Sequence, residues 1–237
     1  MTAQTASSDT LRGGPAAAAR PRPRRWGAAA LAAAVAALTA SLACAPELAA
    51  QGPFPQTRGG RLSGLEKQQL LAIAAEPLAA IREGREPRMP QVSGNLAASL
   101  PLAVSLYLDG ELVARSWEIK RPGPLAASAM ALAARALTGP SWGSPTAAAD
   151  VPRLKAGILV LHGFIQIKDD TQLPDGHGAV VMNGFKEGVA GPMDAPPGAK
   201  PSEILSFASR MAGMRPGGWM IPESTLFASP ADEAREE

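Results

Sequence analysis

The sequence predicts an α+β fold, in which an antiparallel or mixed sheet is flanked by helices and preceded by an apolar N-terminal signal helix. Segments with the 3.6-residue period of a helix alternate with segments of period two, which is typical of strands. Two dipeptides that favour tight hairpins, Asp109-Gly110 and Asn183-Gly184, follow strand candidates. Hairpins produce antiparallel pairs, and helices supply apolar faces that cover a sheet, so the α+β class follows.

The first helix of the domain is predicted to begin at Ser63. Ser63 and Glu66 have the spacing of a capping box, in which each side chain satisfies a free backbone donor of the first turn. The apolar residues that follow at helical spacing are Leu70, Ile73, Leu78 and Ile81. Pro77 falls inside this run, so we expect a kink or an early end of the helix.

The period then changes to two. Apolar residues alternate along residues 100–108, which predicts a strand, and the pattern resumes over residues 113–119 after the Asp109-Gly110 turn. These two segments therefore predict a hairpin. A second helix is predicted over residues 124–137, and Gly139-Pro140 ends it.

The second half of the domain has the same mixture. Residues 156–167 (AGILVLHGFIQI) are the strongest candidate for a buried strand, and residues 178–182 predict another. A last helix is predicted to begin at Pro201 or Ser202 and to end at Gly213. The expected organisation is a leader (1–44), a flexible linker rich in Pro, Gly and Gln (45–60), one α+β domain (61–230) and an acidic tail (231–237).

The leader has the parts of a secretory signal. Four arginines lie between residues 20 and 25, residues 26–43 carry no charge, and Cys44 follows a small residue. Three interpretations treat this segment as a leader: a lipoprotein lipidated at Cys44, a signal cleaved elsewhere (for instance after Ala50), or an uncleaved anchor near the lower length limit for a membrane span. A disordered tail rich in Ala and Arg is the fourth interpretation that stays open. The three leader interpretations predict an exported protein of the cell envelope or periplasm, with membrane contact through the leader or a lipidated Cys44.

The charge balance argues against nucleic acid as a partner. The chain has 23 basic and 21 acidic residues, but residues 1–43 hold five arginines and one aspartate, so the remainder has 18 basic and 20 acidic residues. No basic patch remains beyond the leader. The single cysteine excludes an intrachain disulfide and a cysteine-based zinc site, and the sequence indicates no metal and no cofactor.

One short motif favours a serine hydrolase, but its context does not. Gly139-Pro140-Ser141-Trp142-Gly143 matches G-x-S-x-G, which in hydrolases lies between a strand and a helix. Here a predicted helix precedes Ser141 and Pro145 follows it, and the His162-Gly163 pair lies after the motif instead of before it. Hydrolase chemistry through Ser141 is therefore disfavoured.

The two histidines differ in context. His162 lies within the apolar segment 156–167 and is interpreted as a structural histidine. His177 lies in Pro-Asp-Gly-His-Gly, a loop-like segment, where it could act as a general base oriented by Asp175.

Several segments, in order, resemble a known family. They are residues 106–112 (LYLDGEL), the helix at 124–137, the strand at 154–160, residues 176–181 (GHGAVV), residues 188–193 (GVAGPM) and the segment from Ile204 to Trp219. Together they resemble the AMMECR-type domain, the family of the AMME syndrome candidate gene protein, over about residues 61–230. The resemblance implies an α+β fold with an antiparallel sheet flanked by helices, and no settled activity.

The chain departs from this family at its LRGCIG motif. Val113, Ala114 and Arg115 follow Leu112, so the motif's Arg, Gly and Cys are absent, and an arginine does not replace a thiolate nucleophile. The sequence thus favours a non-catalytic binding or structural module for an envelope protein or small ligand. The ligand-binding candidates are His177, Pro192, Trp117 and Arg115. The alternative is an enzyme that uses His177 as general base with Asp175.

Overall fold

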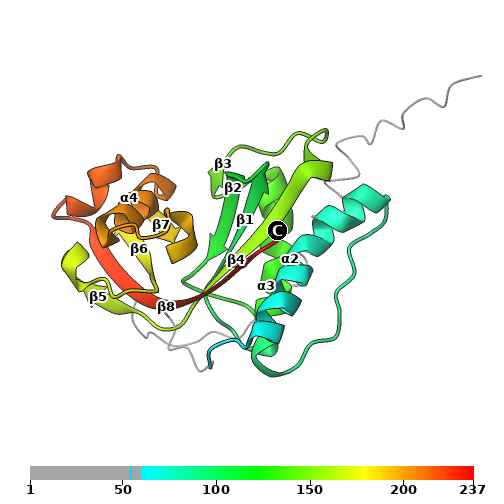
Figure 1. Ribbon diagram of the computed structural model, residues 1–237, viewed down its shortest axis with the longest axis horizontal. Coiled ribbons are helices and arrows are strands. Elements are labelled where there is room, and N and C mark those ends of the chain that lie inside the picture. The colour runs from blue at the N-terminus through cyan, green and yellow to red at the C-terminus, as the bar shows by residue number, and fades with distance from the viewer. Residues whose placement is uncertain (1–53, 55–59) are drawn as a thin grey trace, which may run out of the picture.

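A curled antiparallel sheet with three α-helices makes up the computed structural model, which describes Phe54 and residues 60–237 (Figure 1). The α+β class predicted from the sequence is confirmed. Cys44 and the expected signal helix lie outside the described residues. In the part of the chain that is described, no helix is both long and apolar enough to span a bilayer.

The sheet has one continuous hydrogen-bonded path with the order β3-β2-β1-β4-β8-β6-β7, and β5 pairs with β8 beside this path. Its strands are β1 (Leu102–Leu108), β2 (Glu111–Glu118), β3 (Trp142–Gly143), β4 (Leu154–Leu161), β5 (Ile165–Ile167), β6 (His177–Asn183), β7 (Lys186–Ala190) and β8 (Thr225–Arg235). Each described pair is antiparallel.

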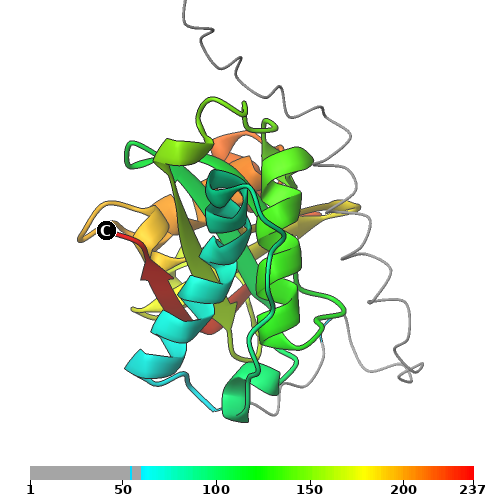
Figure 2. The ribbon, with the colours of Figure 1, turned by 90° about the vertical axis from the view of Figure 1, so that its right-hand side faces the viewer.

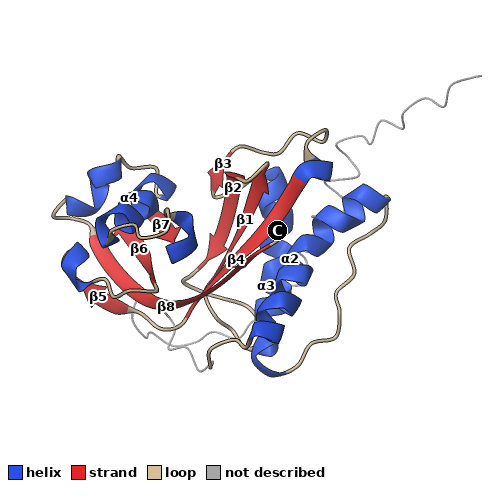
Figure 3. Ribbon diagram, in the orientation of Figure 1, coloured by secondary structure: helices blue, strands red, loops and turns tan. Residues whose placement is uncertain are grey.

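Strand β8 joins two halves of the molecule. Its first part, residues 225–230, pairs with β6, and its second part, residues 231–235, pairs with β4. Figure 3 shows β8 running from one half to the other. We call β1–β4 with their helices the large lobe, and β5–β7 with theirs the small lobe.

Three helices cover the sheet. They are α2 (Gly64–Glu83) and α3 (Leu125–Thr138) on the large lobe and α4 (Pro201–Met211) on the small lobe. Figure 2 shows α2 and α3 side by side over the large lobe. The 3₁₀ turns are η2 (Gly94–Ala97), η3 (Val151–Arg153), η4 (Asp170–Gln172), η5 (Pro192–Asp194) and η6 (Pro216–Met220). Each lobe has its own buried apolar cluster beneath its helices.

The predicted start of the first helix is confirmed, but an early end at Pro77 is wrong. The Ser63 hydroxyl accepts from the Glu66 N–H at 3.2 Å, and the Glu66 carboxylate accepts from the Ser63 N–H at 2.8 Å. The helix continues through Pro77 to Glu83. Pro77 is buried, so packing of its ring offsets the backbone hydrogen bond that a proline lacks.

The first hairpin turn is confirmed, and the second lies one residue later than expected. Asp109 (φ 52°) and Gly110 (φ 89°) both adopt the left-handed backbone of a tight turn between β1 and β2. In the other hairpin, Asn183 pairs with Lys186, so Gly184 and Phe185 form the loop.

Two sequence predictions are corrected by the sheet. Residues 156–167 do not form one strand, because Gly163 (φ 75°) interrupts them: β4 pairs with the second part of β8, and β5 pairs with the first. Residues 231–237 are not simply an acidic tail, because residues 231–235 continue β8 inside the sheet. Their carboxylates have partners in both lobes, which allows acidic residues to occupy a central strand.

One residue of the expected linker lies against the domain. The Phe54 ring stacks on Phe164, with 4.0 Å between ring centroids, and meets Phe227 edge-on at 4.6 Å. Offset and edge-on aromatic pairs of this kind are favourable beyond their burial. Phe54 therefore packs this position of the expected linker against the domain.

Candidate functional site

Arg115 of β2 links the two lobes. Only 2% of its side chain is exposed. Its Nε donates to Ser105 Oγ at 2.7 Å, and its Nη1 donates to the Val189 carbonyl at 3.1 Å and to Asp194 Oδ2 at 2.7 Å. A second contact, from Nη2 to Asp194 Oδ1, makes the ion pair bidentate. Burial lowers the pKa of Arg115, but the Asp194 carboxylate outweighs burial and raises that pKa overall.

A second β2 residue, Trp117, also contacts β7. The Trp117 indole Nε1 donates to Glu187 Oε1 at 3.2 Å, and Lys120 Nζ lies 3.0 Å from Glu187 Oε2. Arg115 and Trp117 have the same parity on β2, so both side chains leave the same face of the strand. The curled sheet is thus held by side chains at the point where β2 meets β7.

Glu233 of β8 lies at the same junction with fewer partners. Its Oε2 accepts from the Met193 N–H at 2.9 Å. A Cβ at position 191 would lie 1.6 Å from its Oε1, so Gly191 leaves the space that this carboxyl occupies. Burial raises the pKa of Glu233 to about 7; Asp194 adds to the rise, while the Met193 N–H and Arg115 oppose it. This carboxyl can therefore exchange a proton near neutral pH.

Tyr107 completes this group of side chains. It is 9% exposed, and the Arg235 guanidinium lies 4.8 Å from its ring centroid. Burial raises the pKa of the Tyr107 hydroxyl, and the charge of Asp194 adds to that rise. We call Tyr107, Arg115, Asp194 and Glu233 the inter-lobe cluster.

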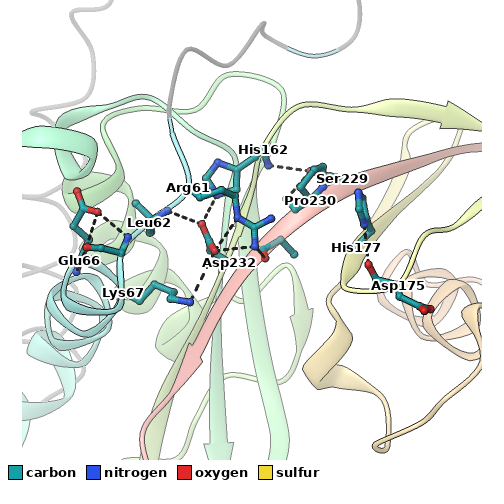
Figure 4. Close-up of polar contacts among 12 residues, drawn as sticks. Arg61, Leu62, Glu66, Lys67, His162, Asp175, His177, Ser229, Pro230 and Asp232 are labelled. Atoms are coloured by element: carbon teal, nitrogen blue, oxygen red, sulfur yellow. Dashed lines mark hydrogen bonds and ion pairs between the residues drawn. The ribbon is translucent and has the colours of Figure 1, made fainter.

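A second polar group lies around Asp232, the residue next to Glu233. Asp232 Oδ2 accepts from the Leu62 N–H at 2.7 Å and lies 2.7 Å from His162 Nε2, while Oδ1 accepts from Arg61 Nε at 3.1 Å (Figure 4). Lys67 Nζ is 4.0 Å away. We call Arg61, Leu62, Lys67, His162 and Asp232 the N-terminal cluster, because it joins the start of the domain to β8.

His162 is a structural member of this cluster, in agreement with its interpretation from the sequence. Burial lowers the pKa of His162, which outweighs the opposing effect of Asp232. The neutral ring therefore donates from Nε2 to Asp232. Its Nδ1 is buried and has no hydrogen-bond partner among the described residues.

Among the described residues, His177 makes no hydrogen bond to the other predicted ligand-binding residues. His177 Nδ1 lies 3.1 Å from the backbone carbonyl of Asp175, and the Asp175 carboxylate points away in Figure 4. The carboxylate thus does not orient the ring. Arg115 and Trp117 lie together at the junction of the lobes, and Pro192 begins the turn that carries Asp194.

Ser141 has no hydrolase geometry. Its hydroxyl accepts from Arg135 at 3.2 Å, its N–H donates to Ser116 Oγ at 3.4 Å, and no hydrogen bond within residues 60–237 joins it to a histidine. The last two residues of the G-x-S-x-G motif form the short strand β3, so no helix begins directly after Ser141.

Three residues of the inter-lobe cluster were not predicted from the sequence: Tyr107, Asp194 and Glu233. Asp194 pairs with Arg115 across 79 residues, and Glu233 lies in the segment interpreted as a tail. One signal was present, since Tyr107 is the only tyrosine of the chain and lies in a predicted strand. Within the described residues, no three His, Cys, Asp or Glu side chains are grouped so that they could hold a metal ion.

Fold and clusters together define an α+β protein built on a single curled antiparallel sheet whose two lobes are joined through β8. No protein-family model and no curated protein matches the sequence. The structure is similar to that of the uncharacterized protein PH0010 from Pyrococcus horikoshii, with a TM-score of 0.57 and 18% sequence identity, over 72% of this chain and 91% of that chain. At this level of identity, the likeness shows a shared fold and no shared activity.

Proposed function

We propose that this chain is an AMMECR-like domain, exported and held at the membrane by its N-terminal region, that acts as a binding module and not as an enzyme. The observation that carries the proposal is the burial of Arg115. This residue stands where the family motif has its cysteine, and its guanidinium is engaged by Ser105, Val189 and Asp194. A structural ion pair has therefore replaced a candidate nucleophile.

The surroundings of Arg115 support a structural role for this position. A guanidinium is not a nucleophile, and the 2% exposure of this side chain leaves it no access to a substrate. Asp194, its partner, is equally buried. Both charges are used to hold the lobes together.

The N-terminal region supports the membrane part of the proposal. A basic segment, an uncharged run and Cys44 occur in the order of a lipoprotein signal. Nine residues separate Cys44 from Phe54, which packs on Phe164. Because an extended chain spans at most about 3.5 Å per residue, a lipid on Cys44 would keep Phe54 within roughly 35 Å of the bilayer.

A second candidate function is an enzyme with His177 as general base, and one observation favours it. His177 Nδ1 lies 3.1 Å from the Asp175 carbonyl, and a tautomer with its proton on Nδ1 would donate to that oxygen and leave Nε2 with a free lone pair. His177 is partly exposed at the start of β6, where a substrate could reach it.

Two measurements test the proposal. In the native host, labelling with a palmitate analogue should mark the wild-type protein but not a Cys44→Ala variant, which should leave the membrane fraction. A host carrying His177→Gln and Glu233→Gln together should keep the phenotype of the wild type, because a binding module needs no proton transfer. Loss of that phenotype, with unchanged protein level, would show that one of these two side chains is essential and would favour the enzyme.

A further inference from the structure

A groove lies beside α2, and none of its lining residues belongs to either cluster. Its volume is about 590 Å³, within the range of small-ligand and peptide pockets. One wall is a single face of α2, formed by Gln69, Ala72, Ile73 and Glu76. The other wall comes from the segment after α2, and consists of Arg85 and residues 88–93. The groove is thus bounded by a helix on one side and by a stretch of irregular chain on the other.

The floor of the groove is apolar. Ile73 is 4% exposed and lies at the bottom, and Val92 is partly buried against the same core. Ala72 is exposed and small, so it leaves room above the helix. Met89 contributes a flexible apolar side chain that is 45% exposed. An apolar side chain of a ligand would be buried here.

The segment opposite α2 offers unused backbone groups. Pro90 favours an extended conformation at Met89, and Ser93 is extended, with φ −141° and ψ 179°. Pro90 has no N–H, and within the described part of the chain the other backbone N–H and C=O groups of residues 89–92 make no hydrogen bond to backbone. Such a row of free groups can pair with an added strand.

The charge of the walls is positive. Arg85 is paired with Glu76 and Glu83, and its hydrogen bond lowers the pKa of Glu76. The Arg88 side chain has no carboxylate partner among the described residues, so the lining has two arginines against one glutamate. An anionic group on a ligand could form an ion pair with Arg88.

We infer that this groove binds an extended peptide segment of a partner protein. The peptide backbone pairs with residues 89–92, an apolar side chain lies over Ile73 and Val92, and an acidic residue meets Arg88. This is strand addition beside a helix, in which main-chain hydrogen bonds give affinity and side-chain pockets give specificity. The inference rests on the proposed function in that it treats the domain as a binding module.

The test uses full-length protein in detergent and a phage-displayed library of random 12-residue peptides. Selected peptides are synthesised, and their Kd values are measured by fluorescence anisotropy. Ala72→Arg fills the groove, and both residues are good helix formers, so the variant should keep its melting temperature. Gln68→Arg, exposed on the same helix but outside the groove, is the matched control.

The expected result is at least a tenfold loss of affinity with Ala72→Arg and less than twofold with Gln68→Arg. Methylation of alternate peptide backbone nitrogens should weaken binding about tenfold, because it removes donors from the added strand. Arg88→Ala should weaken only peptides with Asp or Glu. The inference is overturned if no peptide is enriched, if enriched peptides bind Ala72→Arg as tightly, or if the methylated peptides bind unchanged. None of these outcomes alters Cys44 labelling or the phenotype of the double variant, so the proposed function is tested separately.

Discussion

Asp232 and Glu233 are neighbours on β8, but their side chains leave opposite faces of the strand and enter different surroundings. Asp232 meets a backbone N–H from Leu62, the Arg61 guanidinium and the His162 ring. Glu233 has one N–H donor, from Met193, and lies close to a second carboxylate whose arginine is already engaged. The number of hydrogen-bond donors, and not burial alone, therefore decides the role of each carboxyl. Asp232 holds the start of the domain against β8. Glu233 instead has a pKa raised to about 7.

Of the variants considered, Arg115→Met, on the Glu233 side of β8, should destabilise the fold most. This variant leaves the buried Asp194 carboxylate without its cation and should lower the free energy of unfolding by about 3–5 kcal/mol. Denaturation in urea measures the change. The loss should also raise the pKa of Glu233 further, because Arg115 opposes the rise in that pKa.

A double variant separates the ion pair from simple packing. Arg115→Met with Asp194→Leu removes both charges, and it should recover most of the lost stability because no buried charge stays unpaired. If the double variant is as unstable as Arg115→Met alone, the ion pair does not explain the effect and the contacts to Ser105 and Val189 are responsible.

On the other face of β8, Asp232→Asn should have the next largest effect. The amide can still accept the Leu62 N–H, but its own N–H groups would face donors on Arg61 and His162. We expect a loss of about 2–3 kcal/mol in the free energy of unfolding, since hydrogen bonds to a charged group are among the stronger ones. Asp175→Asn, at an exposed carboxylate, is the matched control and should change stability by less than about 0.5 kcal/mol. Equal effects of the two variants would contradict the role of Asp232.

Glu233 should also make the stability of the protein depend on pH. The pKa of Glu233 is about 7 in the folded protein against an ordinary value of 4.5, so between these pH values the folded state binds one more proton than the unfolded state. Stability should therefore fall as pH rises from about 4.5 to 7, by on the order of 1–2 kcal/mol once partial exposure is allowed for.

Glu233→Gln is the variant that isolates this effect. His162 contributes the opposite slope, because its lowered pKa makes stability rise with pH up to the pKa of the unfolded ring. The difference between wild type and Glu233→Gln, measured by thermal denaturation from pH 5 to pH 8, removes the His162 contribution. Parallel curves for the two proteins would mean that Glu233 does not titrate in this range.

The sequence reveals those parts of the structure that depend on neighbouring residues. The capping box at Ser63 and the turn at Asp109-Gly110 need only residues one to three positions apart, and both are confirmed. The second part of β8 could not be predicted in this way. Asp232 meets Leu62 across 170 residues and Glu233 meets Met193 across 40, so the local sequence shows only an acidic C-terminal segment.

The same limit applies to the residues of the candidate site. Arg115 and Trp117 were predicted as ligand-binding residues from a motif position, but the residues that bury them belong to β7 and η5. A motif identifies a position in the sequence, but the chemistry of the residue at that position depends on the partners that the fold places next to it. The strand at 156–167 shows the same limit, because its apolar run is continuous in sequence and is broken in space by the backbone of Gly163.

Ser63→Ala should change the free energy of unfolding least, and its combinations with other variants test whether the two faces of β8 are independent. Ser63→Ala removes the N-cap of α2 and should cost about 1 kcal/mol in the free energy of unfolding. Leu62, next to this cap, donates to Asp232, so the cap and Asp232 hold the same segment. Ser63→Ala combined with Asp232→Asn should therefore be non-additive by about 0.5 kcal/mol or more, while its combination with Glu233→Gln should be additive within error. Coupling of Ser63 to Glu233 as strong as its coupling to Asp232 would mean that β8 transmits changes across the sheet, and that the two carboxyls are parts of one network.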